Sequence, residues 1–133
     1  MQSAFLLAEQ PAKVALEGIR RGLPPAMFDQ VAAALGLSSS KLAEKLGVAR
    51  RTLTRKHGSG NPLPADVSEK ILRVARIRNL ARRVFATDRA VAQWLLKRDS
   101  ALGSVAPIDM LDTEIGGREV EDLLISLAHG QFV

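Results

Sequence analysis

Residues 39–56 read SSKLAEKLGVARRTLTRK, a stretch with the spacing of two short helices joined by a tight turn. Apolar or small side chains recur where the two helices would face each other, at Leu42, Ala43, Leu46, Val48 and Leu53. A small residue at Ala43 lets the second helix cross closely over the first, and Gly47 permits a turn with positive φ. This spacing predicts a helix-turn-helix.

The second helix of the pair presents basic and hydroxyl side chains at its outward positions. We interpret five of them as candidate DNA contacts: Arg50, Arg51, Thr52, Thr54 and Arg55. An arginine can donate two hydrogen bonds to guanine, whereas Thr52, nearer the helix start, suits a backbone phosphate. Lys56 stands where such helices bury an apolar residue, so a plain helical hairpin with a basic face remains an alternative.

Apolar spacing, prolines and capping residues predict further helices on both sides of this pair. We expect helices over about residues 12–21, 26–35, 39–46, 50–57, 64–86, 89–97 and 118–129, with a single turn after Pro107 and with residues 113–117 leading into the last helix. No strand pattern or internal repeat is visible. The prediction is an all-α fold, with a helix-turn-helix bundle over residues 1–86 and a small helical module over residues 87–133.

The composition agrees with aliphatic helix packing, because 47% of the 133 residues are hydrophobic and only 4% are aromatic. There is no cysteine, and His57 and His129 stand alone, so we expect no disulfide, no metal site and no cysteine nucleophile. No apolar run approaches the roughly 18 residues of a membrane span, and the first residues lack the basic flank of a secretory signal. We therefore expect a cytoplasmic protein with no membrane partner.

Charge is divided unevenly along the chain, whose net charge is +5. Residues 39–89 carry thirteen Lys or Arg against four Asp or Glu, whereas residues 107–133 carry one against six. This division predicts two surfaces with different partners, a polyanion for the basic middle and a basic or largely apolar partner for the acidic end. The arginines of the helix expected over residues 64–86 could contact phosphates that flank the binding site. They could equally well pair with the acidic C-terminal segment.

The residue patterns of enzyme chemistry are missing. Asp109, Asp112 and Glu114 come nearest to a carboxylate cluster, and helix capping or solvation explains them better. Gly116-Gly117 lacks the preceding strand that a nucleotide-binding turn requires. We expect a protein that is not an enzyme and that uses neither cofactor nor metal.

The C-terminal third carries short motifs in a consistent order. They are Trp94-Leu95, Ala101-Leu102-Gly103, PIDMLDT at 107–113, GGREVEDLL at 116–124 and His129-Gly130. These residues resemble the toxin-binding domain of the Xre/MbcA/ParS antitoxins. The preceding part, with Thr52-Leu53, Pro62-Leu63 and ILRVA at 71–75, is similar to the Xre-like DNA-binding region that accompanies this domain. The first 38 residues match it loosely.

The resemblance implies a type II antitoxin encoded with a RES-domain toxin that consumes NAD or transfers ADP-ribose from it. The C-terminal domain would block the toxin's NAD pocket, and the helix-turn-helix would repress the operon as a homodimer or a larger toxin-antitoxin oligomer. The toxin contacts implied are Glu119, Asp122, Ser126, His129, Gly130 and Phe132, while Trp94, Leu111 and Leu124 belong to the core. A second hypothesis is a plain helix-turn-helix repressor whose C-terminal half only dimerises.

Overall fold

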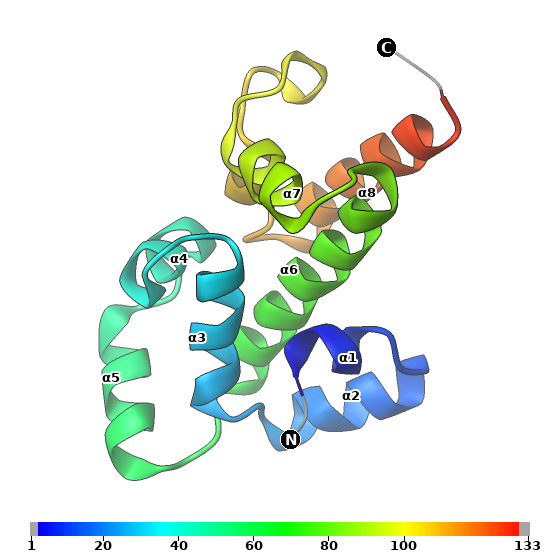
Figure 1. Cartoon of the computed structure of the whole chain (residues 1–133). Coiled ribbons are helices and arrows are strands. Elements are labelled where there is room, and N and C mark those ends of the chain that lie inside the picture. The colour runs from blue at the N-terminus through cyan, green and yellow to red at the C-terminus, as the bar shows by residue number, and fades with distance from the viewer. Residues whose placement is uncertain (1–2, 131–133) are drawn as a thin grey trace.

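The computed structural model describes residues 3–130, apart from the side chains of residues 55–59. Within that part the chain forms eight α-helices and two 3-10 helices, with one isolated bridge between Asp99 and Val105 (Figure 1). The elements are α1 (Ala4–Ala8), α2 (Ala12–Arg21), α3 (Pro25–Ala34), α4 (Ser39–Leu46), α5 (Arg50–Ser59), α6 (Ala65–Val84), α7 (Asp88–Leu96), η1 (Ser100–Leu102), η2 (Pro107–Met110) and α8 (Glu114–Ala128). The expected all-α fold is confirmed. Among the described residues, no helix has the length and apolar character needed to cross a bilayer.

Most of the expected helices begin and end within about two residues of their predicted limits, and three differences stand out. The helix α8 begins at Glu114 and includes Gly116 and Gly117, which the sequence places before the helix. The sequence does not predict α1, whose N-cap is Ser3, with a hydroxyl that accepts a hydrogen bond from the Leu6 amide at 3.0 Å. The backbone of α5 stays helical through Gly58 and Ser59, which the sequence predicts as loop.

The long helix α6 lies at the centre of the molecule (Figure 1). It contacts α1, α2 and α3, and also α7 and α8. The sequence predicts one apolar stripe on α6, but the structure buries residues on more than one of its faces, including Val67, Leu72, Ala75 and Ile77. The additional burial arises because the N-terminal helices cover a side of α6 that would otherwise face solvent.

Polar contacts fasten α1 to its neighbours. The Asn79 amide donates a hydrogen bond to the Phe5 carbonyl at 2.9 Å, and the Arg78 guanidinium lies 4.6 Å from the centre of the Phe5 ring. The Ala4 amide donates to the side-chain oxygen of Gln30 at 2.9 Å. The short helix α1 is therefore held by tertiary contacts with α6 and α3.

The C-terminal part has the core that the sequence predicts. Leu111 and Leu124 are fully buried, and Trp94 is half-buried, with its ring centre 5.5 Å from that of Phe85. Thr113 caps α8 by accepting a hydrogen bond from the Gly116 amide at 3.0 Å. These contacts fix the start of α8 against η2 and α6.

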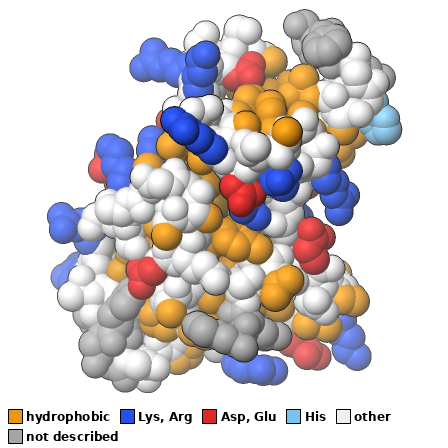
Figure 2. Space-filling model, in the orientation of Figure 1, with side chains coloured by type: hydrophobic (Ala, Val, Ile, Leu, Met, Phe, Trp, Pro, Cys, Tyr) orange, Lys and Arg blue, Asp and Glu red, His pale blue; other side chains and the backbone are white. Residues whose placement is uncertain are grey.

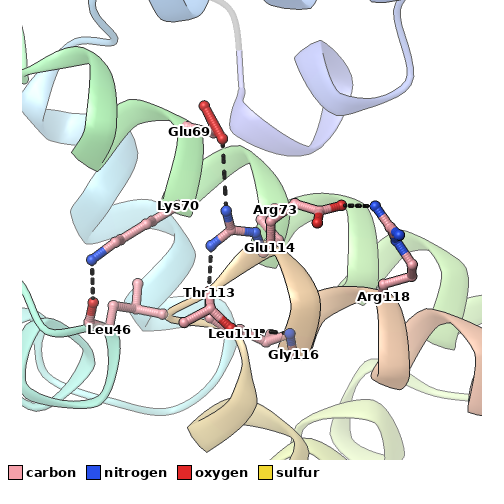
Figure 3. Close-up of polar contacts among 9 residues, drawn as sticks. All are labelled: Leu46, Glu69, Lys70, Arg73, Leu111, Thr113, Glu114, Gly116 and Arg118. Carbon is pink, nitrogen blue, oxygen red and sulfur yellow. Dashed lines mark hydrogen bonds and ion pairs between the residues drawn. The ribbon is translucent and has the colours of Figure 1, made fainter.

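The junction between α6, η2 and α8 is tight enough to require two glycines. A Cβ atom on Gly116 would overlap the carbonyl oxygen of Met110, and one on Gly117 would lie 2.8 Å from Cδ of Arg73. Arg73 is 7% exposed, and its Nη1 donates a hydrogen bond to the Leu111 carbonyl at 2.8 Å (Figure 3). Gly116-Gly117 therefore serves close helix packing.

The substitution Gly116→Ala tests this packing. It is expected to lower the free energy of unfolding by about 2–3 kcal/mol, because the added methyl overlaps a backbone oxygen that moves only with η2. Gly36→Ala is the control, since Gly36 has φ +71° with nothing within 4 Å of an added Cβ, and its expected cost is about 1 kcal/mol. Urea denaturation followed by circular dichroism measures both losses. Equal losses would contradict the tight junction.

Candidate functional site

The helix-turn-helix is formed by α4 and α5. Leu42, Ala43 and Leu46 are fully buried, and Val48 and Leu53 are 8% and 6% exposed. Gly47 ends α4 with φ +68°, and the Val48 amide then donates to the Ala43 carbonyl at 2.8 Å. The wedge of apolar side chains and the positive φ that the sequence predicts are confirmed.

A lysine from α6 completes the end of α4. Lys70 Nζ donates a hydrogen bond to the Leu46 carbonyl at 2.8 Å (Figure 3). This oxygen belongs to the last residue of α4, where helix carbonyls lack an intrahelical partner and a positive charge is stabilising. Lys45, also on α4, forms an ion pair with Asp109 of η2 at 3.2 Å. The helix-turn-helix is therefore tied both to α6 and to the C-terminal part.

The candidate DNA contacts differ in how free their side chains are. Arg50, Arg51 and Thr54 are exposed, Thr52 is half-buried, and the side chain of Arg55 lies outside the described residues. The Thr54 hydroxyl donates to the Arg50 carbonyl at 3.2 Å, so its proton is directed to the backbone of its own helix. The side chains of Arg50 and Arg51 form no hydrogen bond or ion pair with the described part of the chain.

The arginines of α6, in contrast, are paired with acids. The pairs are Arg73 with Glu69, Arg76 with Glu121, Arg78 and Arg82 with Asp88, and Arg83 with Glu9. Burial lowers the pKa of Arg73, and the charge of Glu69 opposes that shift. Lys and Arg side chains also project from the edge of the molecule over α4 and α5 (Figure 2). The basic charge of the chain is thus largely neutralised on α6 and unpaired at the start of α5.

Polar groups at the start of α4 lie beside Arg50. A hollow of about 410 Å³ there is lined by Ser38, Ser40, Lys41, Glu44, Val48 and Arg50. Lys41 also pairs with Glu44 at 3.5 Å, with both side chains largely exposed. Hydroxyl and cationic groups at a helix N-terminus suit a phosphate oxygen.

The candidate toxin contacts of α8 lie along one side of that helix. Glu119, Asp122, Ser126 and His129 follow one another at spacings of three and four residues. Ser126 is half-buried and the other three are exposed, while Val120 and Leu124 on the other side are fully buried. Gly130 is exposed with φ +71°, and Phe132 lies outside the described residues. We call Glu119, Asp122, Ser126 and His129 the α8 stripe.

The acids of α8 fall into a paired and an unpaired set. Glu114 accepts a hydrogen bond from Arg118 at 2.8 Å, and Glu121 lies 3.5 Å from Arg76. Within the described part of the chain, the side chains of Glu119 and Asp122 form no hydrogen bond or ion pair. The hydrogen bond to Glu114 raises the pKa of Arg118, and the nearby charge of Asp122 adds a smaller effect. The unpaired carboxylates are therefore the two that belong to the α8 stripe.

Two of the three acids near η2 have ion-pair partners on different helices. Asp109 pairs with Lys45, and Glu114 pairs with Arg118. No group of three or more potential metal ligands gathers among the side chains that the structure describes.

Hydrophobic side chains form a patch in the upper part of the face shown in Figure 2, over α7 and α8. Exposed apolar patches are common at protein-binding surfaces.

Comparison with known proteins supports both halves. Residues 14–76 match the model of the Antitoxin Xre-like helix-turn-helix domain, and residues 80–130 match that of the Antitoxin Xre/MbcA/ParS C-terminal toxin-binding domain. The chain is 28% identical over 120 residues to Antitoxin Xre of Yersinia enterocolitica, covering 90% of this chain and 81% of the relative. It is 29% identical over 113 residues to Antitoxin Xre of Photorhabdus laumondii, covering 84% and 76%. It is also 27% identical over 123 residues to the Prs ADP-ribosylating antitoxin of a Sphingobium species, covering 86% and 77%.

The fold and these matches define the class of protein as an antitoxin that carries a helix-turn-helix and a separate toxin-binding region. The chain belongs to the Xre/MbcA/ParS family of antitoxins, and its partner is a cognate toxin. The class is not one of enzymes.

Substitutions in α5 should distinguish a residue that packs in the core, Leu53, from one that faces solvent, Arg51. Leu53→Ala is expected to lower the free energy of unfolding by about 2–4 kcal/mol, because it leaves a cavity between α5 and α4. Arg51→Ala is expected to change stability by less than about 0.5 kcal/mol, because its side chain is exposed and unpaired. Urea denaturation gives both values. A large loss in Arg51→Ala would contradict the outward placement of that side chain.

Proposed function

We propose that this antitoxin neutralises a RES-domain toxin by placing the α8 stripe over its NAD pocket, and that α5 binds the operator of its own operon. Residues 1–86 form the DNA-binding region and residues 87–133 the toxin-binding domain, acting together in the cytoplasm. The observation that carries the proposal is the division of unpaired charge, with cations at the start of α5 and carboxylates along α8.

The acidic stripe supports blocking of a dinucleotide pocket. A pocket that accepts the two phosphates of NAD is commonly lined by Arg or Lys, and carboxylates on an inserted helix complement those groups. Glu119 and Asp122 are free to do so, since neither forms an ion pair within the described residues. The name of the Sphingobium relative links an antitoxin with ADP-ribosylation, which agrees with a RES-domain partner.

The α5 surface supports operator binding. Arg50 and Arg51 lie at the start of α5, and both are exposed because Leu53 packs the opposite side of this helix into the core. In a helix-turn-helix, residues at the start of the second helix contact base edges and phosphates in the major groove. One helix makes too few contacts for tight specificity, so we propose a homodimer on an inverted repeat, with larger toxin-antitoxin oligomers.

Neutralisation is tested with Glu119→Gln and Asp122→Asn combined. The double variant should bind the inactive RES-domain protein encoded beside this gene about 10- to 100-fold more weakly, because two charge pairs are lost. Its binding should also depend less on salt. Glu17→Gln combined with Asp66→Asn is the control, because both residues are exposed acids on other helices. Isothermal titration calorimetry measures the affinities. An unchanged affinity in the α8 variant would contradict the proposal.

The competing hypothesis of a plain repressor is tested in the same titration. A plain repressor binds no RES-domain protein stoichiometrically, and substitutions on α8 would then alter only self-association. Stoichiometric binding by the unchanged chain, lost on substitution of the α8 stripe, distinguishes the antitoxin from the plain repressor.

Operator binding is tested with Arg50→Ala and Arg51→Ala combined. Gel shifts over a salt series should show weaker binding and a log–log salt slope flattened by about 1–2, because each lost phosphate contact contributes about 0.9. Arg20→Ala combined with Arg21→Ala removes the same charge from exposed residues of α2, which lies across the molecule from α5 (Figure 1). Equal losses in the two variants would show only an effect of net charge, and would contradict a reading role for α5.

A further inference from the structure

Ile115 is the most exposed large hydrophobic side chain among the described residues. It is 74% exposed, compared with 41% for Ile125 on the same helix. A single exposed aliphatic side chain is ordinary on a protein surface, so exposure alone indicates no function. The position of Ile115 is what distinguishes it, because it is the second residue of α8 and precedes Glu119 by one helical turn.

The exposure of Ile115 is imposed by its neighbours. Gly116 packs against the Met110 carbonyl and Gly117 against the side chain of Arg73, so this part of α8 is pressed onto η2 and α6. The Thr113 hydroxyl and carbonyl accept hydrogen bonds from the amides of Gly116 and Gly117, both at 3.0 Å. Rotation of α8 to bury Ile115 would break these contacts.

Arg73 of α6 fixes the segment that precedes α8. Its guanidinium donates to the Leu111 carbonyl at 2.8 Å and lies 3.7 Å from Glu69 (Figure 3). Its aliphatic stem lies against Gly117. Leu111 leads directly into the Thr113 cap, so the segment before α8 and its first turn are fixed by the same side chain. The direction of Ile115 is therefore determined before any partner binds, which reduces the entropy lost on binding.

Ile115 extends the α8 stripe by one turn. Residues 115, 119, 122, 126 and 129 follow spacings of four and three, which place them on one side of a helix. Its neighbours one turn along α8 are Arg118, which pairs with Glu114 at 2.8 Å, and Glu119, with Asp122 one further turn along the same side. Glu119 and Asp122 are the two carboxylates of α8 whose side chains form no ion pair in the described part of the chain. The surface is thus an apolar tip followed by acidic groups, and its complement is an apolar socket bordered by Lys or Arg.

We propose that Ile115 is the apolar anchor of the toxin interface and that it enters such a socket on the toxin. The inference rests on the proposed binding of a RES-domain toxin through the α8 stripe. Ile115 supplies affinity that does not depend on salt, whereas Glu119 and Asp122 supply the charge-dependent part.

The test compares Ile115→Ser with Ile125→Ser in the full chain, titrated with the inactive RES-domain protein encoded beside the gene. Ile115→Ser should weaken binding about 10- to 100-fold at both low and high salt, as expected for the loss of one buried aliphatic side chain. Ile115→Val should weaken it by less than about 5-fold. Ile125→Ser should change it by less than about 3-fold, because Ile125 lies about a quarter-turn from Ile115 and lines a hollow with Arg76, Leu80 and Glu121, on the side of α8 that faces α6.

Thermal unfolding and sedimentation separate the alternatives. Ile115→Ser should keep the thermal midpoint of the unchanged chain, because the side chain is exposed. A loss of 3-fold or less, or equal losses at residues 115 and 125, would overturn the inference while leaving the proposed function intact. A change in self-association with unchanged toxin affinity would overturn it in favour of a contact with a second copy. No binding by the unchanged chain would overturn the proposed function and this inference together.

Discussion

Two cations on neighbouring turns of α6 fasten α4 and the segment before α8 to the same central helix. Lys70 donates to the carbonyl that ends α4, and Arg73 donates to the Leu111 carbonyl that precedes α8. Each satisfies a backbone oxygen that would otherwise lack a partner, and an unsatisfied buried acceptor costs about 1–3 kcal/mol. With the Lys45–Asp109 pair, these contacts fix α5 and α8 relative to the same central helix.

This arrangement separates structural charges from charges available to partners. The arginines of α6 pair with acids of α6, α7 and α8 and with Glu9, so the helix with the most Lys and Arg contributes little unpaired charge. Arg50 and Arg51 on α5, and Glu119 and Asp122 on α8, have no such pairs within the described residues. Under the proposed function, electrostatic steering of DNA and of the toxin would act at different places on one small chain.

Local signals in the sequence predict most of the fold. Gly47, Thr87 and the prolines before α3 and α6 mark helix ends by their own backbone or capping chemistry. The helix α1 escapes prediction because its five residues are too few to show a period, and its stabilising contact with Asn79 spans 74 positions. The same holds for Arg73, whose partner carbonyl is 38 positions away and whose burial reverses the usual placement of arginine.

The sequence predicts the candidate binding surfaces only in part, because helical spacing is a local signal whereas ion pairing between helices is not. Helical spacing brings Glu119, Asp122, Ser126 and His129 to one side, but nothing in the local sequence distinguishes these carboxylates from Glu114 and Glu121. That distinction depends on where Arg118 and Arg76 lie, and for Glu121 the partner is on another helix. The sequence likewise does not distinguish Ile115 from the other apolar residues of this helix. Its exposure follows only from the contacts of Gly116 and Gly117, which fix the orientation of α8.

Hydrogen exchange of backbone amides tests the central claim most directly, with the chain measured alone, with its toxin and with operator DNA. The account predicts that the toxin protects residues 114–128 and that the operator protects residues 39–59, each with little change at the other segment. Protection of the same segment by both partners, or toxin protection that spares α8, would contradict the account.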